Sequence, residues 1–418
     1  MGDRVGDVCR SHKPPDEWLL LGPVTEILEL RLDELHAIGA LPDGGTYRPL
    51  YSDAWAEAVK RVERWFKDAG LKTTRDAVGT LWGRAEGTDK GKSIVTGSHI
   101  DTVRRGGRLD GALGIVAGLT AVETLLATKG KPRRTLEVVA ICEEEGSRFA
   151  TNFWGSRAIT GRIDKVDADI AQAMRERGLD PAKISAAARD DIDTFVELHI
   201  EQGALLEASG AALAVVSAIV GTAHLEVTVT GRPDHAGTTP MELRRDALAG
   251  AAVMIQAVES VARSLGKPAV ATVGRVRAEP DQINVIPGRA VFTIDLRHSD
   301  LSARKALEQR IRSLCATVAS ERGLQFAIRM LQEWPPVPMH PEVRAVLARA
   351  AQDTGVAAEE MVSGAGHDAQ ILAARCRVGM LFVPSIGGRS HCPEETTSPE
   401  HLALGTHVLQ RALELLAY

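Results

Sequence analysis

Residues 98–114 read Ser-His-Ile-Asp-Thr-Val-Arg-Arg-Gly-Gly-Arg-Leu-Asp-Gly-Ala-Leu-Gly, and they follow a short run, 93–97, that predicts a strand. Side chains alternate along an extended segment, so His99 and Asp101 point the same way, and Asp101 can hold one imidazole nitrogen while the other binds a metal. Glycines on either side of Asp110 allow a sharp turn that brings a second ligand to the same place. Taken alone, the stretch could be a solvated loop, but its pattern is that of half a metal site.

The size and composition of the chain indicate a globular protein of two domains. Its 418 residues exceed one compact core, and 44% hydrophobic and 25% charged residues are ordinary values. The net charge of −5 is mild and the charges intermingle, which argues against a nucleic-acid partner. The segment 1–16 is polar and acidic, unlike a secretory signal, and no apolar run approaches the roughly 20 residues of a membrane span. We therefore expect no membrane association.

The cysteines bear on the compartment. Five cysteines at scattered positions, with no Cys-x-x-Cys pair, support neither a disulfide framework nor a thiolate zinc site. A reducing compartment suits such a chain best, so we expect a cytoplasmic location.

Strands and helices alternate through the first half of the chain. This alternation is typical of an α/β domain with a mainly parallel sheet. The candidate ligands follow predicted strand ends, where open α/β sheets place their sites. We expect helices at 23–38, 53–69, 111–126, 153–160 and 170–177, and strands at 94–97, 135–142 and 194–199.

From about Leu213 the pattern becomes that of a smaller inserted α+β domain with the order β-α-β-β-α-β. The segment 334–338, Trp-Pro-Pro-Val-Pro, is typical of a stiff linker back to the first domain. We therefore predict a catalytic, metal-binding domain at residues 1–212 and 334–418, and an inserted domain at 213–333. Within the insertion we expect strands around 225–229, 269–276, 290–297 and 325–331, and helices at about 243–265 and 303–322.

Three consecutive glutamates, Glu143 to Glu145, follow the apolar run 138–141 and precede Gly146. Such a run usually lies on the surface, but the apolar strand and the glycine favour burial near the sheet edge. Like charges at this spacing raise each other's pKa unless a cation neutralises them. One glutamate can therefore bind a metal while a neighbour acts as the general base for a water molecule.

Two histidines complete a candidate ligand set. His199 ends a predicted strand, and His391 lies in a glycine-rich loop. Separately each signal is weak, because a lone histidine at a strand end is more often a core residue and such loops are often plain turns. Together with His99, Asp110 and one glutamate they give three imidazoles and two carboxylates. This set suits two zinc-like or manganese-like ions, with Asp110 as the bridge.

Eight ordered runs of the chain form a recognisable pattern. The runs are Thr96–Val103, Leu109–Gly114, Glu143–Phe149, Phe153–Arg157, Glu197–Gly203, His235–Met241, Asn284–Gly288 and Ser363–Gln370. They resemble the hydantoinase/carbamoylase amidases, a branch of the di-metal aminoacylase and carboxypeptidase-G-like superfamily that includes allantoate amidohydrolases and N-carbamoyl-L-amino-acid hydrolases. The resemblance extends from about residue 25 to the end of the chain.

The resemblance implies a role for each matching position of the catalytic domain. One metal site would consist of His99, Asp110 and His199, and the other of Asp110, Glu145 and His391. Glu144 would be the general base and acid, and Asp101 would orient His99. The implied cofactors are two divalent ions, zinc or manganese, with cobalt or nickel as substitutes in vitro.

The resemblance also implies that the inserted domain is a lid and forms the interface of a homodimer, in which the partner chain can supply lid residues. His235 would stabilise the developing oxyanion. The planar fork of Arg297 suits a carboxylate, with a lid salt bridge as its alternative role. The implied substrate contacts are Gln202, His224, His235, Asn284, Arg297 and the backbone around Gly366.

His224 departs from the pattern of the bacterial allantoate amidohydrolases, which carry an arginine at this position. A histidine is shorter and can be neutral, so a second acidic or ureido group would be held less firmly. The departure puts allantoate in doubt as the substrate and leaves the type of reaction unchanged.

The reaction that the resemblance implies is hydrolysis of a ureido (N-carbamoyl) C–N bond, in an N-carbamoyl-L-amino acid or in allantoate, with release of ammonia and carbon dioxide. An aminoacylase-like or dipeptidase-like peptidase would use the same metals, but His199, where many peptidase relatives carry a carboxylate, favours the amidase by analogy. A non-catalytic binding protein built on an inactivated hydrolase is a third alternative. Such a chain would usually have lost a ligand or the base, whereas every expected position is filled.

Overall fold

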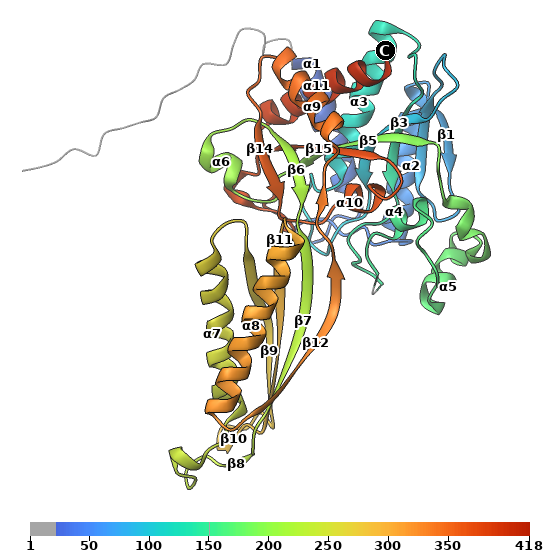
Figure 1. Ribbon diagram of the computed structural model, residues 1–418. Coiled ribbons are helices and arrows are strands. Elements are labelled where there is room, and N and C mark those ends of the chain that lie inside the picture. Colours follow the sequence, from blue (N-terminus) through green and yellow to red (C-terminus); the bar gives the residue numbers. More distant parts are fainter. Residues whose placement is uncertain (1–21, 150) are drawn as a thin grey trace, which may run out of the picture. The chain divides into compact units, whose positions relative to one another are not determined.

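The computed structural model describes residues 22–149 and 151–418, and the chain divides into two compact units (Figure 1). Unit 2 is larger than the predicted inserted domain, 213–333. Residues 334–344 and 360–379, which follow the predicted insertion, also belong to this unit. The segment 1–16, which is predicted not to be a secretory signal, lies outside the described residues. Unit 1 comprises the described residues up to Ala214 with Ala345–Glu359 and Met380–Tyr418, and unit 2 comprises Val215–Arg344 with Glu360–Gly379.

Unit 1 is built on a central sheet with the strand order β1-β2-β4-β3-β5-β15. β3 is parallel to both β4 and β5, whereas β1 and β2 form an antiparallel edge. Every side chain of β3 and β4 is buried, as expected for central parallel strands covered on both faces. The bounds are β1 Lys72–Arg75, β2 Leu81–Ala85, β3 Ser93–His99, β4 Leu136–Ile141, β5 Ile192–Ile200 and β15 Arg377–Val383.

The helices of unit 1 confirm the predicted helices, with ends shifted by no more than three residues. Ser52 caps the helix that begins at Asp53, because its side chain accepts a hydrogen bond from the Trp55 backbone N–H at 3.1 Å. The bounds are α1 Gly22–Ala37, α2 Asp53–Asp68, α3 Ala112–Lys129, α4 Trp154–Ile159, α5 Ala168–Glu176, α6 Leu205–Ser209 and α11 Pro399–Ala417, with a 3₁₀ helix at Pro181–Ala187.

Two glycines let α3 lie unusually close to β3. A Cβ atom on Gly114 would lie 2.6 Å from the Cβ atom of Ser98, and one on Gly118 would lie 3.0 Å from a methyl carbon of Thr96. Glycines four residues apart share one face of a helix, so this face of α3 can press against the strand. The close approach places the turn that precedes α3 directly beside the end of β3.

Unit 2 contains the predicted β-α-β-β-α-β order, in the elements β7, α7, β9, β11, α8 and β12. Their strands form an antiparallel sheet of order β12-β7-β11-β9, and α7 and α8 pack on the same face of it (Figure 1). One apolar core that includes Val227, Met254, Phe292 and Leu307 joins the sheet to both helices. The bounds are β7 Gly221–Thr230, α7 Ala247–Leu265, β9 Val270–Glu279, β11 Arg289–His298, α8 Leu301–Glu321 and β12 Gln325–Trp334.

Two predictions for unit 2 were wrong in detail. α7 begins at Ala247 and not at Leu243, because Asp246 accepts a hydrogen bond from the Ala249 backbone N–H at 2.9 Å and caps the helix there. The predicted linker 334–338 is partly strand, since β12 continues to Trp334 and Val337–Pro338 forms β13. β13 pairs with β6, Ala214–Ile219, in antiparallel register.

The remaining elements are short and lie around the two units. β8 Asp234–His235 and β10 Val285–Ile286 pair with each other as a small separate ribbon. The other bounds are α9 Pro341–Asp353, β14 Glu359–Ser363 and α10 Asp368–Leu372, with 3₁₀ turns at Met241–Leu243 and Ile386–Gly388. Together the two units confirm the predicted fold class: an α/β domain with a mostly parallel central sheet and an inserted α+β domain.

Two helices of the described part, α3 and α7, are long and apolar enough to cross a membrane by length and composition alone. Core helices meet the same criterion, and most of α3 is buried among β3, α1 and α11. One face of α7 is likewise buried in the core of unit 2.

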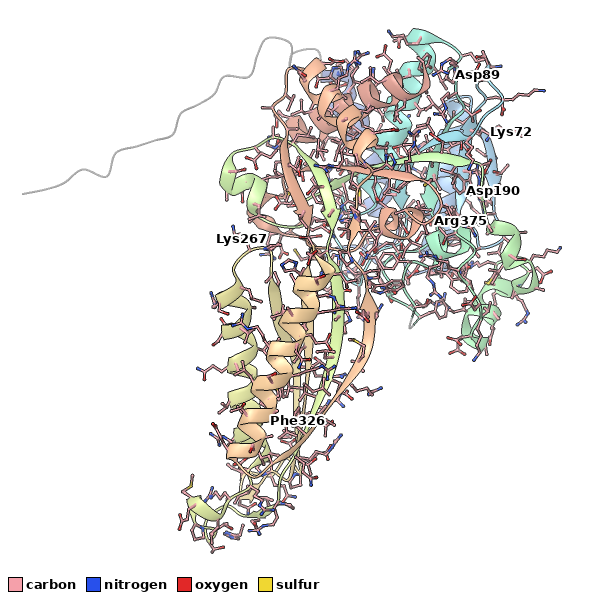
Figure 2. All side chains as sticks on the ribbon, viewed as in Figure 1. Lys72, Asp89, Asp190, Lys267, Phe326 and Arg375 are labelled. Carbon is pink, nitrogen blue, oxygen red and sulfur yellow. The ribbon has the colours of Figure 1, made fainter. Side chains whose placement is uncertain are left out.

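Charged side chains such as Lys72, Asp89 and Asp190 are exposed on unit 1 (Figure 2).

Candidate metal centre

The turn between β3 and α3 brings Asp110 to His99. Gly111 has a φ of 68°, a conformation that favours glycine, and it follows Asp110 directly. A Cβ atom on Gly111 would lie 2.5 Å from Nδ1 of His99, so a larger residue would also collide with the imidazole. Glycine is therefore required here for two independent reasons, and the turn holds Asp110 against the end of β3.

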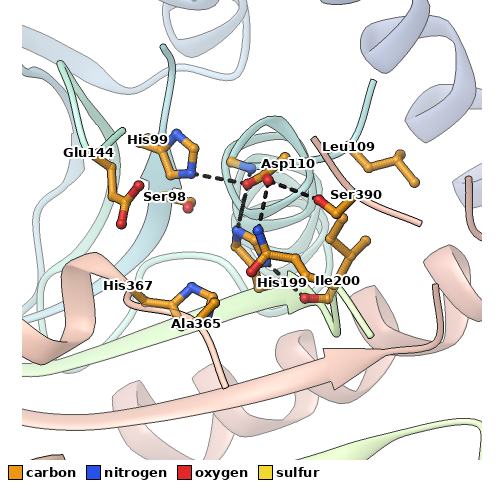
Figure 3. A network of polar contacts seen from close by, with 12 residues as sticks. Ser98, His99, Leu109, Asp110, Glu144, His199, Ile200, Ala365, His367 and Ser390 are labelled. Atoms are coloured by element: carbon orange, nitrogen blue, oxygen red, sulfur yellow. Dashed lines mark hydrogen bonds and ion pairs between the residues drawn. The ribbon is translucent and has the colours of Figure 1, made fainter. Parts of the chain in front are cut away.

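Asp110 lies at the centre of a buried cluster (Figure 3). Its Oδ1 atom lies 3.3 Å from Nε2 of His99 and 3.2 Å from Nε2 of His199, which is carried by the neighbouring strand β5. Its Oδ2 atom lies 3.1 Å from Nε2 of His391, and the same nitrogen is 3.5 Å from Oε1 of Glu145. The two oxygens of one carboxylate thus face two different groups of ligands.

Each group could hold one ion. The potential ligand atoms of His99, Asp110 and His199 lie within 4.8 Å of one another, and so do those of Asp110, Glu145 and His391. The structure therefore brings together all five residues that the sequence predicted as ligands, although they come from four separate segments of the chain. Their assignment as ligands remains a prediction of the sequence.

The backbone and Asp101 orient two of the imidazoles. Nδ1 of His199 lies 2.9 Å from the Ile200 carbonyl oxygen, and Nδ1 of His99 lies 3.3 Å from a carboxylate oxygen of Asp101. These acceptors favour a proton on Nδ1, which leaves the Nε2 lone pair directed at Asp110. Two lone pairs facing a carboxylate repel it unless a proton or a metal cation lies between them, so the donor set fits a cation.

The electrostatics of the cluster point the same way. Burial alone would raise the pKa of Asp110, but hydrogen bonds from His199, His391 and His99 outweigh it and hold that pKa well below its usual value. Burial and the adjacent Asp110 charge raise the pKa of Glu145 to about 7. The hydrogen bond to Asp110 raises the pKa of His391 to about 9. Without metal the site therefore accumulates protons, which divalent ions would replace.

The three consecutive glutamates have separate environments. Glu143 is buried, and its side chain accepts hydrogen bonds from the backbone N–H groups of Gly146 and Trp154, so it closes the loop before α4. Asp101 accepts from the backbone N–H groups of Glu144 at 3.0 Å and Glu145 at 3.3 Å. These bonds hold the loop so that the carboxylates of Glu144 and Glu145 lie within 4.8 Å of His99.

Gln202, predicted to contact substrate, lies beside the cluster. Its backbone has a φ of 59°, and its backbone N–H donates to the Ser385 hydroxyl at 3.0 Å. Its side-chain Nε2 donates to Oδ2 of Asp110 at 2.8 Å and lies 3.4 Å from Nε2 of His391. The residue therefore lies at the half of the cluster that contains His391.

The sequence reasoning missed two residues of this centre, Ser390 and Glu395. The Ser390 hydroxyl lies 3.1 Å from Oδ2 of Asp110 and 2.8 Å from Oε2 of Glu395. Glu395 is 4% exposed, and burial followed by the Asp110 charge raises its pKa. The only local signal was a pair of adjacent glutamates after His391, and nothing in their order told the buried one from the exposed one.

Three of the predicted substrate contacts gather within unit 2. Arg297 donates from Nε and Nη2 to the Asp295 carboxylate and from Nη1 to the Gly364 carbonyl oxygen at 2.7 Å. Nε2 of His224 lies 3.4 Å from the same Asp295 carboxylate. The loop that contains Gly366 is held by the Ser363 hydroxyl, which bonds to Ala365. Arg297 thus has the salt bridge that was its alternative role.

The other two predicted contacts, His235 and Asn284, lie beyond the opposite end of the four-stranded sheet of unit 2, at the β8–β10 ribbon. The Asn284 carbonyl accepts from the Ala236 backbone N–H at 3.0 Å, so the two residues lie close together. In the register of β7 and β11, Thr222 pairs with Arg297 and Thr230 with Arg289. Eight residues of strand separate the two ends, roughly 27 Å at 3.4 Å per residue. The structure does not bring these residues of one chain to Arg297.

The imidazole of His235 is held in one tautomer. Its Nδ1 accepts from the backbone N–H groups of Gly237 at 3.0 Å and Thr238 at 3.2 Å. The ring proton of the neutral form is therefore on Nε2, and the side chain is exposed. Such a nitrogen is a preoriented hydrogen-bond donor, which is the property that an oxyanion requires.

Comparison with known proteins places this arrangement in a family. Residues 95–415 match the family described as Peptidase family M20/M25/M40. The allantoate amidohydrolase of Bacillus subtilis (strain 168) is 41% identical over 397 residues, which cover 93% of this chain and 96% of that protein. The N-carbamoyl-L-amino acid amidohydrolase of Geobacillus stearothermophilus is 38% identical over 403 residues, which cover 94% of this chain and 98% of that protein.

Solved structures give the same result. The crystal structure of an amidase of the hydantoinase/carbamoylase family from Burkholderia multivorans matches with a TM-score of 0.87 and 34% identity. The match covers 94% of this chain and 98% of that one. The chain therefore belongs to peptidase family M20/M25/M40 and, within it, to the hydantoinase/carbamoylase amidases.

Proposed function

We propose that this protein is a metal-dependent amidohydrolase that cleaves the ureido C–N bond of an N-carbamoyl-L-amino acid or of allantoate, releasing ammonia and carbon dioxide. The observation that carries the proposal is the buried Asp110, whose two oxygens face His99 and His199 on one side and His391 on the other. The names of relatives that match more than 90% of the chain supply the substrate class.

The roles of the chain's own residues follow from this geometry. When bound, two divalent ions supply Lewis acidity, which polarises a carbonyl group and lowers the pKa of water. Glu144, beside His99, takes a proton from the attacking water and returns it to the leaving nitrogen. His99, His199 and His391 would hold the ions, and Asp101 keeps the ring of His99 in place.

Arg297 and His224 recognise the acidic end of the substrate. Arg297 is bidentate to Asp295 in this structure, so a substrate carboxylate must compete with Asp295 for the guanidinium. The hydrogen bond to Asp295 raises the pKa of His224, so a protonated imidazole is favoured at this position over the neutral one expected from its residue type. With His224 protonated, the side chains of Arg297, His224 and Asp295 carry one net positive charge, which suits a single carboxylate better than two acidic groups.

A homodimer would unite the two ends of the lid sheet. His235 and Asn284 lie too far along the sheet from Arg297 to contact the same small molecule from one chain. A second chain that presents its own β8–β10 ribbon to the site would supply the oxyanion donor. The outer edge of β9 is unpaired within the described residues, and Val270 and Val276 on this strand are about half exposed. Both features support β9 as the dimer edge.

The metal and the compartment complete the proposal. Three imidazoles favour zinc and the two carboxylates tolerate manganese, so either ion suits the donor set. We propose a cytoplasmic location on the composition of the chain. Metal analysis of the protein as purified from its own cells, together with cell fractionation, tests both points.

An ammonia-release assay tests the proposed reaction. Purified protein supplied with manganese or zinc is offered N-carbamoyl-L-amino acids, allantoate, N-acetyl amino acids and dipeptides. Cleavage of the acetyl and peptide substrates, which yields no ammonia, is measured as released amino groups. We expect metal-dependent ammonia release from ureido acids and little cleavage of the acetyl and peptide substrates. Cleavage of dipeptides or N-acetyl amino acids alone would identify a peptidase or aminoacylase. Binding of ureido acids with no turnover under either metal would identify a non-catalytic protein.

A further inference from the structure

Glu395 connects the two loops that carry the ligands of the second group. Its Oε1 atom accepts from the backbone N–H groups of Leu109 at 2.8 Å and Asp110 at 3.0 Å. Its Oε2 atom accepts from the Ser390 hydroxyl at 2.8 Å and from the His391 backbone N–H at 3.3 Å. One buried carboxylate thus binds the backbone of Asp110 and of His391, which are 281 positions apart in the sequence.

His391 needs such support more than the other imidazoles do. Its side chain is 48% exposed, whereas those of His99 and His199 are 3% and 1% exposed. Its φ of 56° is also unfavourable for a residue other than glycine. Packing therefore holds this ring less firmly than the other two, so the hydrogen bonds of its own loop matter more for its position.

Gly107 packs directly against the side chain of Glu395. A Cβ atom on Gly107 would lie 2.2 Å from Oε1 and 2.3 Å from Cβ of Glu395, so glycine is required for the carboxylate to reach the turn. All four neighbouring groups donate hydrogen bonds to the carboxylate of Glu395. A glutamine here would replace one carboxylate oxygen with an NH₂ group, which would face hydrogen-bond donors. The neighbouring Glu394 offers a contrast, because it is 64% exposed and forms a salt bridge with Arg389 at the surface.

We propose that Glu395 is a positioning residue for the second ion, because its buried carboxylate ties the Asp110 turn to the His391 loop and so keeps Asp110, Glu145 and His391 within reach of one ion. The proposal rests on the di-metal centre of the proposed function. It assigns Glu395 no contact with substrate and no contact with the ions.

Equilibrium dialysis of the full-length, chelator-stripped protein against Mn²⁺ tests this role, because it counts bound ions per chain without reference to activity. Glu395→Gln is compared with the matched surface control Glu394→Gln. His391→Ala lacks a ligand of the second ion, so the binding step that it loses identifies that ion. We expect the wild type and Glu394→Gln to bind two ions in the same two steps. Glu395→Gln should weaken the step lost in His391→Ala by about 10–100-fold and affect the other step less.

A second variant keeps the test decisive if Glu395→Gln does not fold. Gly107→Ala keeps the charge of Glu395 but must displace its carboxylate, so it should weaken the same step. Folding of each variant is checked by circular dichroism before dialysis. The inference is overturned if a folded Glu395→Gln or Gly107→Ala protein binds both ions as the wild type does, or loses both steps equally.

The wild-type isotherm separates this inference from the proposed function. A wild-type protein that binds two ions while Glu395→Gln is unchanged overturns the role of Glu395 alone. A wild-type protein that binds no Mn²⁺ or Zn²⁺ overturns the proposed function, and the role of Glu395 with it.

Discussion

At the scale of single residues, the types of the candidate ligands could be predicted from sequence, whereas most residues that hold them, Asp101 apart, could not. His99 and Asp110 are recognisable because His99 ends a predicted strand and glycines flank Asp110. A turn at these glycines can bring the carboxylate back to the imidazole. Glu395 was missed because its contacts are backbone N–H groups of Leu109 and Asp110, which leave no mark on the sequence. Glu143, next to the assigned base, is likewise recognisable as a loop-closing residue only from its bonds to Gly146 and Trp154.

Glu144→Gln tests the assignment of the general base. The amide has nearly the same shape but cannot take a proton from water, so we expect kcat to fall by about 10²–10⁴-fold. Metal content should stay that of the wild type, because Glu144 is not assigned as a ligand. Steady-state kinetics on a ureido acid and metal analysis of the same sample check both parts. A Glu144→Gln protein with wild-type turnover would show that another group is the base.

The pair of His224 and Asp295 predicts a pH-dependent contribution to stability. The hydrogen bond to Asp295 raises the pKa of His224 above its ordinary 6.5. Burial raises the pKa of Asp295, but hydrogen bonds from His224 and Arg297 outweigh it and lower that pKa below 3.8. The stability that protonated His224 contributes is therefore complete below pH 6.5, and it is lost as the pH rises through the raised pKa. The stability that ionised Asp295 contributes is lost only in acid.

We expect His224→Gln to lower the Tm by roughly a few degrees at most at pH 6, since partly exposed ion pairs contribute little, and by less at pH 9. Thermal melts at both values measure the difference. Equal losses at pH 6 and pH 9 would mean that the charge on His224 does not contribute.

At the scale of elements, hydrophobic periodicity predicted which segments are helices and strands, but local capping and close packing decided their ends. α7 begins at Ala247 because Asp246 caps it, although the apolar pattern extends back to Leu243. The segment 334–338 contains three prolines and was predicted to be a linker, yet β13 forms there at Val337–Pro338. β13 pairs with β6, more than 100 residues earlier, and a short stretch of sequence cannot predict such a pairing.

Gly114→Ala tests the close packing of α3 on β3. The added Cβ would lie 2.6 Å from Cβ of Ser98 and 2.8 Å from the Leu198 carbonyl oxygen, so helix and strand must separate. We expect a loss of about 1–3 kcal/mol in the free energy of unfolding, together with weaker Mn²⁺ binding because the Asp110 turn moves with the helix.

Gly91→Ala is the matched control for this prediction, because nothing lies within 4 Å of its Cβ position. Chemical denaturation and Mn²⁺ dialysis of both variants measure the two effects. If Gly114→Ala were as stable as Gly91→Ala and bound Mn²⁺ equally well, the close approach would not position the site.

At the scale of the whole molecule, the sequence allowed the two-part architecture to be predicted but not the distribution of the substrate contacts. The order β-α-β-β-α-β places His235 just beyond one end of the four-stranded sheet of unit 2 and Arg297 at the other, and this separation follows from strand register. Register depends on pairing between distant segments. The sequence positions of the predicted substrate contacts therefore could not show that His235 and Arg297 of one chain lie far apart.

Mixing two inactive variants tests whether the site is shared between two chains. In a heterodimer of Glu144→Gln with His235→Ala, one site receives an intact Glu144 from one chain and an intact His235 from its partner. After subunit exchange we expect recovery of about a quarter of wild-type activity, since half of the dimers are mixed and one site in each is intact. Each variant alone is the control. No recovery, when exchange is shown by differently tagged subunits, would mean that His235 acts within its own chain or not at all.

The central claim is that five side chains from four distant segments hold two divalent ions across Asp110. Anomalous diffraction at the manganese edge, from crystals of the full-length protein grown with Mn²⁺, tests it most directly. The account predicts two peaks roughly 3.5–4 Å apart. Asp110 should contact both ions, His99 and His199 one of them, and Glu145 and His391 the other. A map with no peak at Asp110, or with these imidazoles directed away from it, would contradict the account.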